Sequence, residues 1–248
     1  MKNKIYIHFS VDDVFKSLIE VTDKKIPLKK HWFFSQIYEL WKKYNIKTGL
    51  YIFYKGKING RNRSLTEVKN LKNDLKENWI YFGPHALNYA SPPHKFSTKD
   101  QKKHINKIYE QIYRFAGQSN LTKKVRLHEY SECYELKNLF KTYKVNTLFS
   151  TDKNIGAHRL PKKNKNDLIL TGKTIFKNIN FRRTDFRIEN LDKNTNKNLI
   201  KFNKVLKKRK FITIYSHEYE LKKQNIKKKL NDNISLLSKK YELISVRP

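Results

Sequence analysis

Short apolar runs alternate with longer segments of helical period along the whole chain, and this alternation constrains the fold more than any other feature. The expected strands are Ile5–Ser10, Thr48–Tyr54, Trp79–Gly83, Val125–His128, Thr147–Ser150, Asn180–Arg187 and Phe211–Ser216. The expected helices are His31–Tyr44, Leu65–Glu77, Thr98–Phe115, Tyr134–Tyr143, Leu199–Lys208 and Gln224–Leu237. Strands that alternate with helices run parallel and are joined by right-handed crossovers. The pattern therefore predicts an α/β fold with one domain over residues 1–248, whose strands close into a barrel or form an open wound sheet.

The chain carries a formal net charge of +33, which would ordinarily indicate nucleic acid or an anionic membrane surface as a partner. However, only 10 of the 55 basic residues are Arg, and abundant Lys, Asn and Ile together are typical of an AT-rich genome. Sequence-specific readers of nucleic acid favour Arg and carry recognisable motifs, which this sequence lacks. We expect no specific nucleic-acid partner, although a basic nucleic-acid-binding protein remains an alternative. Attraction to anionic glycans, to lipid-linked or nucleotide-linked sugars or to membrane headgroups remains open.

The single cysteine, Cys133, excludes an internal disulfide framework and a cysteine-based zinc cluster. A metal site in this chain must therefore use His and carboxylate side chains. No apolar run approaches the ~20 residues that span a bilayer, and no segment resembles a secretion signal. From these features we expect a cytoplasmic protein, with association to the inner membrane surface left open. The sequence does not indicate an oligomeric state.

Reactive side chains follow the expected strands at the point where each strand ends. They are Asp12, Asp13, His85, His128, Asp152, Asp185 and His217. Loops at the C-terminal ends of parallel strands converge on one mouth, where ligand-binding and catalytic groups collect. The sequence therefore predicts one site at this edge.

The adjacent carboxylates of Asp12 and Asp13 point in different directions on a strand, so one can bind a metal while the other takes a proton from water. An acidic pair also suits the N-terminus of a helix, and the residues alone leave both interpretations open. His85, Asp13 and one further His would supply two imidazoles and one carboxylate. This donor set suits zinc or a similar divalent ion with open positions for water and substrate.

Four segments resemble, in order, the motifs of the polysaccharide deacetylases of the NodB-homology type, also called carbohydrate esterase family 4. They are FSVDD (residues 9–13), FGPHALNY (82–89), VRLHEY (125–130) and ITIYSHE (212–218). The sequences of these segments look closest to the WbmS-like branch of the family, which is associated with bacterial surface-polysaccharide loci. The resemblance implies a seven-stranded distorted (β/α) barrel of the glycoside hydrolase/deacetylase type. It also implies metal-dependent removal of N-acetyl or O-acetyl groups from a sugar or surface polysaccharide precursor.

The resemblance also implies the role of each residue. Asp12 corresponds to the general base and Asp13 to a metal ligand, while His85 corresponds to a second ligand and His217 to the general acid. Arg126 occupies the place of an Arg-containing motif and is expected to hold Asp12 ionised by charge and hydrogen bonding.

The chain departs from the family where a second metal-binding His would stand, because Tyr89 occupies that position. We expect His128 to move into the vacated role, since His94 lies in a loop and is a poorer substitute. Tyr89 itself could donate to a developing oxyanion or pack as an aromatic. If the metal site is lost instead, the alternative is a metal-free, catalytically inactive glycan-binding protein of the same fold.

Several residues are expected to support the site. Asp152 and Asp185 are candidates for orienting a His or Arg, and each could equally cap the following segment. Glu218 could accept a hydrogen bond from the imidazole of His217 or face solvent. The aromatic candidates for packing against a sugar are Tyr51, Tyr89, Tyr130 and Tyr219.

Overall fold

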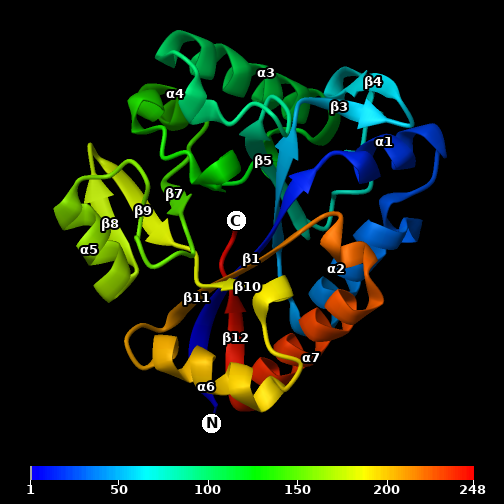
Figure 1. Cartoon of the computed structure of the whole chain (residues 1–248). Coiled ribbons are helices and arrows are strands. Elements are labelled where there is room, and N and C mark those ends of the chain that lie inside the picture. Colours follow the sequence, from blue (N-terminus) through cyan, green and yellow to red (C-terminus); the bar gives the residue numbers. More distant parts are fainter. Residues whose placement is uncertain (1) are drawn as a thin grey trace.

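The structure is a computed structural model that describes residues 2–248. Its larger sheet has the strand order β10-β11-β1-β2-β5, and β12 also pairs with β1, which lies at the centre (Figure 1). The bounds are β1 Asn3–Val14, β2 Thr48–Phe53, β5 Ile80–Ala86, β10 Phe186–Arg187, β11 Phe211–His217 and β12 Tyr241–Ser245. Every pairing in this sheet is parallel.

A smaller sheet has the order β6-β7-β9-β8. The bounds are β6 Lys124–Val125, β7 Thr147–Ser150, β8 Lys173–Phe176 and β9 Ile179–Arg183, and only β8 runs antiparallel to its neighbour. A single bridge between Phe82 and Leu121 links the two sheets beside β5. On the side of the barrel away from β5, β9 and β11 belong to different sheets and the barrel is interrupted there. The two sheets together form a distorted (β/α) barrel. The expected fold class is therefore confirmed.

Helices surround the two sheets (Figure 1). They are α1 Lys16–Asp23, α2 Trp32–Tyr44, α3 Thr98–Ala116, α4 Lys137–Thr142, α5 Lys162–Thr171, α6 Thr195–Leu206 and α7 Gln224–Lys240. The central strands are buried on both faces, as β2 shows, because its six residues are all apolar or small and all buried. The apolar stripes of α2, α3 and α7 pack into the same hydrophobic core as the strands. Between residues 2 and 248, no helix is both long and apolar enough to cross a bilayer.

The expected helix Leu65–Glu77 is wrong. The segment forms a single 3₁₀ turn over Leu65–Glu67 and then continues without a helix to β5. Leu65, Val68, Leu71 and Leu75 recur at helical spacing and are all buried, so the pattern marks burial but not a helix. The backbone is satisfied from outside, because the guanidinium of Arg114 donates to the carbonyl oxygens of Leu65 and Val68.

Other elements also differ from the expectation, since α1, α5, β8 and β12 were not among the expected helices and strands. A hairpin of β3 (Lys55–Ile58) and β4 (Arg61–Ser64) follows β2, where the sequence reading placed no strand. The strand expected over Asn180–Arg187 is divided into β9 and β10, which pair in different sheets. The strand expected over Val125–His128 keeps only β6, and His128 lies in the 3₁₀ turn that follows it.

Candidate active site

A cavity of about 200 Å³ lies at the C-terminal ends of the parallel strands. It is lined by the predicted metal-binding and catalytic residues, which are Asp12, Asp13, His85, Arg126, His128 and His217. Asp12 on β1 is in register with His217 on β11, so these two strand ends bring the expected base and acid to the same level. The predicted edge of the barrel is therefore where the structure brings these residues together.

Asp13 has a left-handed backbone, with φ of +60°. The register between β1 and β2 shifts between Val11 and Val14, which marks a bulge at this point. Adjacent residues of an extended strand would face opposite sides of the sheet, whereas the bulge lets Asp12 and Asp13 line the same cavity. A non-glycine residue in this conformation costs on the order of 1–3 kcal/mol and is typical of functional sites.

Three potential metal-binding atoms converge beside this bulge. The Oδ1 atom of Asp13 lies 3.1 Å from Nε2 of His85 and 3.7 Å from Nδ1 of His128. The two imidazole nitrogens lie 3.3 Å apart. Asp13, His85 and His128 are thus a group that could hold a metal ion. His94, the other candidate for the third ligand, hydrogen-bonds Ser131 instead.

The other nitrogen of each imidazole bonds a backbone carbonyl. Nδ1 of His85 lies 2.7 Å from the carbonyl oxygen of Arg126, and Nε2 of His128 lies 2.9 Å from that of Tyr89. A neutral imidazole that donates through one nitrogen carries a lone pair on the other. Both lone pairs then face the Oδ1 atom of Asp13, which is buried and finds no hydrogen-bond partner within residues 2–248. Three buried acceptors facing one another require a cation or extra protons between them.

The distances test whether a metal fits. A tetrahedral zinc ion with bonds of about 2.0–2.1 Å to nitrogen and oxygen holds its ligand atoms about 3.3–3.4 Å apart. The measured separations of 3.1, 3.3 and 3.7 Å bracket this value. In metal-binding His residues, the ring nitrogen that does not bind the metal typically hydrogen-bonds a carbonyl or carboxylate, as it does in both imidazoles here. The donor atoms therefore fit a divalent ion.

Charges around the group favour a cation. Burial lowers the pKa of His85, but the carboxylates of Asp13 and Asp12 outweigh it and raise that pKa. Burial and the neighbouring His85 lower the pKa of His128 to about 4, so this imidazole is neutral and available as a ligand at neutral pH. Burial raises the pKa of Asp13, but His85 outweighs it and lowers that pKa, which keeps the carboxylate ionised.

Asp12 forms a buried ion pair with Arg126, whose NH1 atom donates to Oδ1 at 2.9 Å. Arg126 is only 1% exposed and also donates to Ser10, and its guanidinium packs over the ring of Tyr215. No hydrogen bond to the second oxygen of Asp12 occurs within residues 2–248, so Oδ2 is left to accept a proton.

His217 is oriented by Glu189, which sequence reasoning missed. The Oε1 atom of Glu189 accepts from the backbone N–H of His217 at 3.0 Å and lies 3.2 Å from its Nδ1. Burial raises the pKa of Glu189, but His217 outweighs it and the pKa is lowered. Glu189 follows β10, the same kind of strand end as the other site residues. Glu189 lies two residues beyond the end of the expected strand Asn180–Arg187, so the same search for reactive side chains at strand ends could have found it.

The turn that presents His128 has an unusual backbone. Glu129 and Tyr130 both have positive φ, +50° and +51°, which folds the chain back after His128. The carbonyl of Tyr89 fixes the imidazole from the other side. The Tyr89 side chain is 70% exposed at the cavity wall and packs edge-on against Phe53.

Other predicted residues lie elsewhere. Asp152 accepts hydrogen bonds from Tyr130 and Tyr215, and so orients two tyrosines but no His or Arg of the site. Asp185 forms an ion pair with Arg209 and accepts from the backbone N–H of Thr213, so the arginine that it orients lies outside the residues that line the cavity.

Glu218 neither bonds the imidazole of His217 nor faces solvent. It is buried, and its carboxylate accepts from the backbone N–H groups of Phe15, Lys16 and Ser17, where it stabilises the N-terminus of α1. Tyr51 is fully buried and its hydroxyl donates to the carbonyl of Lys124, so it cannot pack against a sugar.

No protein-family model and no curated protein sequence matches this chain. Among solved structures, the Bc1960 peptidoglycan N-acetylglucosamine deacetylase is similar with a TM-score of 0.52 and 16% identity, over 99% of this chain and 88% of that one. The peptidoglycan deacetylase PdaC from Bacillus subtilis gives 0.50 and 14%, over 98% and 89%. The 4-alpha-glucanotransferase from Thermococcus litoralis gives 0.59 and 11%, over 98% of this chain but only 39% of that enzyme.

These likenesses establish the fold. The chain has the α/β fold of polysaccharide deacetylases, and within it Asp13, His85 and His128 form a possible metal site. At such identities the glucanotransferase and the deacetylases share an architecture, and a shared architecture does not fix the reaction.

Proposed function

We propose that the protein is a metal-dependent deacetylase that removes N-acetyl groups from a sugar or surface polysaccharide precursor. The observation that carries the proposal is the convergence of the Asp13, His85 and His128 donor atoms in the cavity that Asp12 and His217 also line. Neither a binding protein nor a structural protein requires buried acceptors of this kind beside a separate carboxylate and imidazole.

Zinc is the ion we propose, because two imidazoles and one carboxylate are a typical donor set for catalytic zinc. When bound, such an ion polarises an acyl oxygen and lowers the pKa of water. Asp12, held by Arg126, takes the proton of the attacking water on its free oxygen. His217, held by Glu189, then donates a proton to the leaving nitrogen. An O-acetyl ester would follow the same steps, with oxygen as the leaving atom.

Two exposed aromatic side chains at the site and the likeness to deacetylase structures support the proposed substrate class. Tyr89 and Tyr219 line the cavity and are 70% and 52% exposed, so their rings are free to pack against a sugar. A similar solved structure is, by its name, a deacetylase of peptidoglycan N-acetylglucosamine. We propose that an N-acetylated carbohydrate is also the substrate of this chain. We further propose that residues 1–248 form the single domain that binds it. The WbmS-like resemblance favours a cytoplasmic precursor of a bacterial surface polysaccharide.

The test measures acetate release from N-acetylglucosamine and its oligomers, with an activated acetyl ester as a second substrate. We expect turnover that is lost with a chelator and restored by added zinc, and about one metal ion per chain in protein purified without chelator. Bound metal without turnover on any acetylated sugar would contradict the deacetylase. Binding of the oligomers by metal-free protein would instead favour the inactive glycan-binding alternative.

A further inference from the structure

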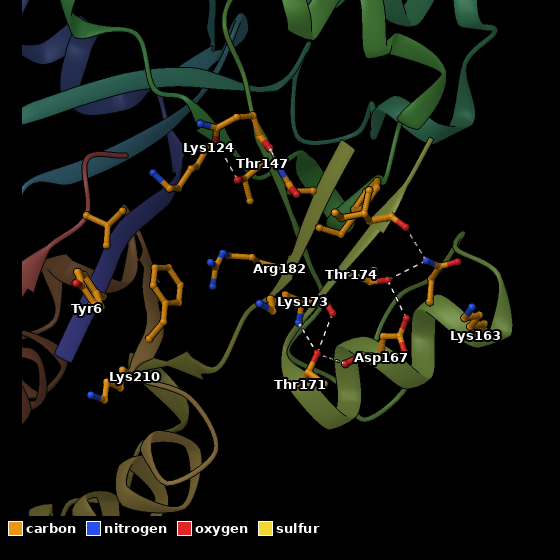
Figure 2. A pocket seen from close by; sticks show the side chains of 17 residues that line it. Tyr6, Lys124, Thr147, Lys163, Asp167, Thr171, Lys173, Thr174, Arg182 and Lys210 are labelled. Atoms are coloured by element: carbon orange, nitrogen blue, oxygen red, sulfur yellow. Dashed lines mark hydrogen bonds between the residues drawn. The ribbon is translucent and has the colours of Figure 1, made fainter. Parts of the chain in front are cut away.

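A second and larger cavity, of about 1100 Å³, lies at the opposite end of the barrel (Figure 2). Its walls come from the N-terminal ends of strands, with Tyr6 of β1, Lys124 of β6, Thr147 of β7 and Phe211 of β11. It opens where β9 and β11 belong to different sheets. In barrels of this kind the N-terminal end usually serves stability and is closed by packing, so an open polar cavity there is unexpected.

Five cationic side chains line this cavity, namely Lys124, Lys163, Lys173, Arg182 and Lys210. Asp167 is its one acidic lining residue, and its carboxylate accepts a hydrogen bond from Thr174. Figure 2 shows Arg182 extending from β9 into the open space, with Lys124 above it and Lys210 below. Cations on β6, on β9 and at the residue before β11 therefore line one cavity.

None of the five forms an ion pair within residues 2–248; Lys124 and Arg182 are half-buried, whereas Lys163, Lys173 and Lys210 are exposed. Arg126, Arg159 and Arg209 each bond a carboxylate. Arg182 instead packs over the ring of Phe211, 4.0 Å from its centroid. Burial and the positive charges of Arg182, Lys123 and Arg247 lower the pKa of Lys124. The ammonium of Lys124 donates a hydrogen bond to the backbone carbonyl of Arg247, which leaves its charge unneutralised.

A lysine-rich composition does not account for this arrangement. Most lysines of the chain lie on exposed surfaces, where water screens their charges. Within residues 2–248 no carboxylate pairs with half-buried Lys124 or Arg182, and the repulsion between these charges opposes their burial. A multivalent anion would remove this repulsion, and a guanidinium with several ammonium groups is the set that binds phosphates.

We propose that this cavity binds a small molecule that carries a diphosphate group, held by Lys124, Arg182 and Lys210. An apolar or aromatic portion of the same ligand packs against Phe211 and Ile175, which also line the cavity. The volume is sufficient for a ligand of nucleotide size. The site lies at the other end of the barrel from Asp13 and His85, so its occupation does not depend on the deacetylase reaction.

Isothermal titration calorimetry of the full chain at physiological salt tests the proposal with three probes: pyrophosphate, a nucleoside diphosphate and a short prenyl diphosphate. All three probes carry a diphosphate group. If the nucleoside diphosphate binds more tightly than the prenyl diphosphate, the remaining portion of the ligand is aromatic, and the reverse order indicates an aliphatic portion. Lys210→Gln and Lys124→Gln should each weaken pyrophosphate binding roughly 10-fold, because each loses one charge-assisted bond. Lys103→Gln, on the exposed face of α3, is the matched control and should bind like the parent.

Lys210 is exposed, so its substitution keeps the test valid even if Lys124→Gln were unstable. The proposal is overturned if none of the three probes binds the parent protein. It is equally overturned if Lys210→Gln and Lys103→Gln bind pyrophosphate alike. Tighter binding of a single-stranded oligonucleotide than of every diphosphate probe, weakened by Lys103→Gln as well, would replace it with a general basic surface for nucleic acid.

Discussion

The carbonyl oxygen of Arg126 lies 2.7 Å from the Nδ1 atom of His85, so the backbone of Arg126 orients a proposed metal ligand. The guanidinium of the same residue bonds Asp12, the proposed base. One residue therefore positions both halves of the site, and the two connections can be separated by mutation, because only the second depends on the side chain.

Arg126→Gln should retain metal, since the carbonyl that bonds His85 remains, but should lose about 10²-fold in turnover. It leaves Asp12 buried without its cation, which should cost about 3–5 kcal/mol of stability. Metal analysis and denaturant unfolding measure the two effects, and Arg126→Lys should recover part of the stability. Loss of metal from folded Arg126→Gln would contradict the separation.

His85→Ala and His128→Ala should each abolish stoichiometric metal binding, because two remaining ligands hold a catalytic ion poorly. His94→Ala is the control and should keep the ion, since His94 bonds Ser131 outside the group. Elemental analysis of the three purified variants measures the number of metal ions bound per chain. Full metal retention in His128→Ala would show that another residue is the third ligand.

Glu189→Gln should lower kcat about 10–100-fold, the loss typical when a partner that orients a functional imidazole is removed. Metal content and KM should stay close to the parent values, because Glu189 contacts His217 and not the donor group. Glu220→Gln, a partly exposed carboxylate two residues beyond Glu218, is the matched control. An unchanged kcat would mean that His217 needs no such partner.

The alternation of apolar strands with amphipathic helices predicted a parallel α/β fold and the strand edge at which the candidate residues lie, whereas the barrel was implied by the family resemblance. The sequence could also have predicted the β3–β4 hairpin, since Asn59 and Gly60, both with positive φ, form the two-residue turn that favours one. The helix expected over Leu65–Glu77 failed for a different reason. Its carbonyls are bonded by Arg114, a contact that local sequence does not encode.

The candidate site was predictable in composition but not in geometry. The left-handed backbone of Asp13 depends on the pairing of β1 with β2, and pairing is a tertiary property. Glu189 approaches His217 because β10 pairs with β11, which no local pattern signals. The role predicted for Glu218 was wrong because α1 was not expected. The backbone N–H groups at the N-terminus of α1, which bond the Glu218 carboxylate, could therefore not be anticipated.

Stability should depend on pH through Lys124. Burial and neighbouring cations lower the pKa of Lys124 to about 8, whereas an unfolded lysine titrates near its ordinary value of about 10.4. Below pH 8 the ammonium is charged in both states and its burial disfavours folding, and this penalty is relieved as the pH rises from about 8 to about 10.4.

Lys124→Met should therefore be more stable than the parent at pH 7, by about 1–3 kcal/mol after allowance for solvent screening of a half-buried group. The difference should shrink towards pH 10. Urea unfolding of both proteins across this range measures it, and Lys103→Met should show no such trend. A variant less stable than the parent at pH 7 would show that Lys124 is not under electrostatic strain.

The most direct test of the account compares metal content and turnover in Asp12→Asn and Asp13→Asn. Asp13→Asn should lose metal, because a neutral amide is a poor ligand for a divalent ion and Oδ1 of Asp13 is the atom nearest both imidazoles. Asp12→Asn should keep about one ion per chain and lose about 10²–10⁴-fold in turnover on N-acetylated sugars, with substrate binding little changed. Parent-like hydrolysis by Asp12→Asn, or full metal content in Asp13→Asn, would contradict the assignment of one aspartate as base and the other as ligand.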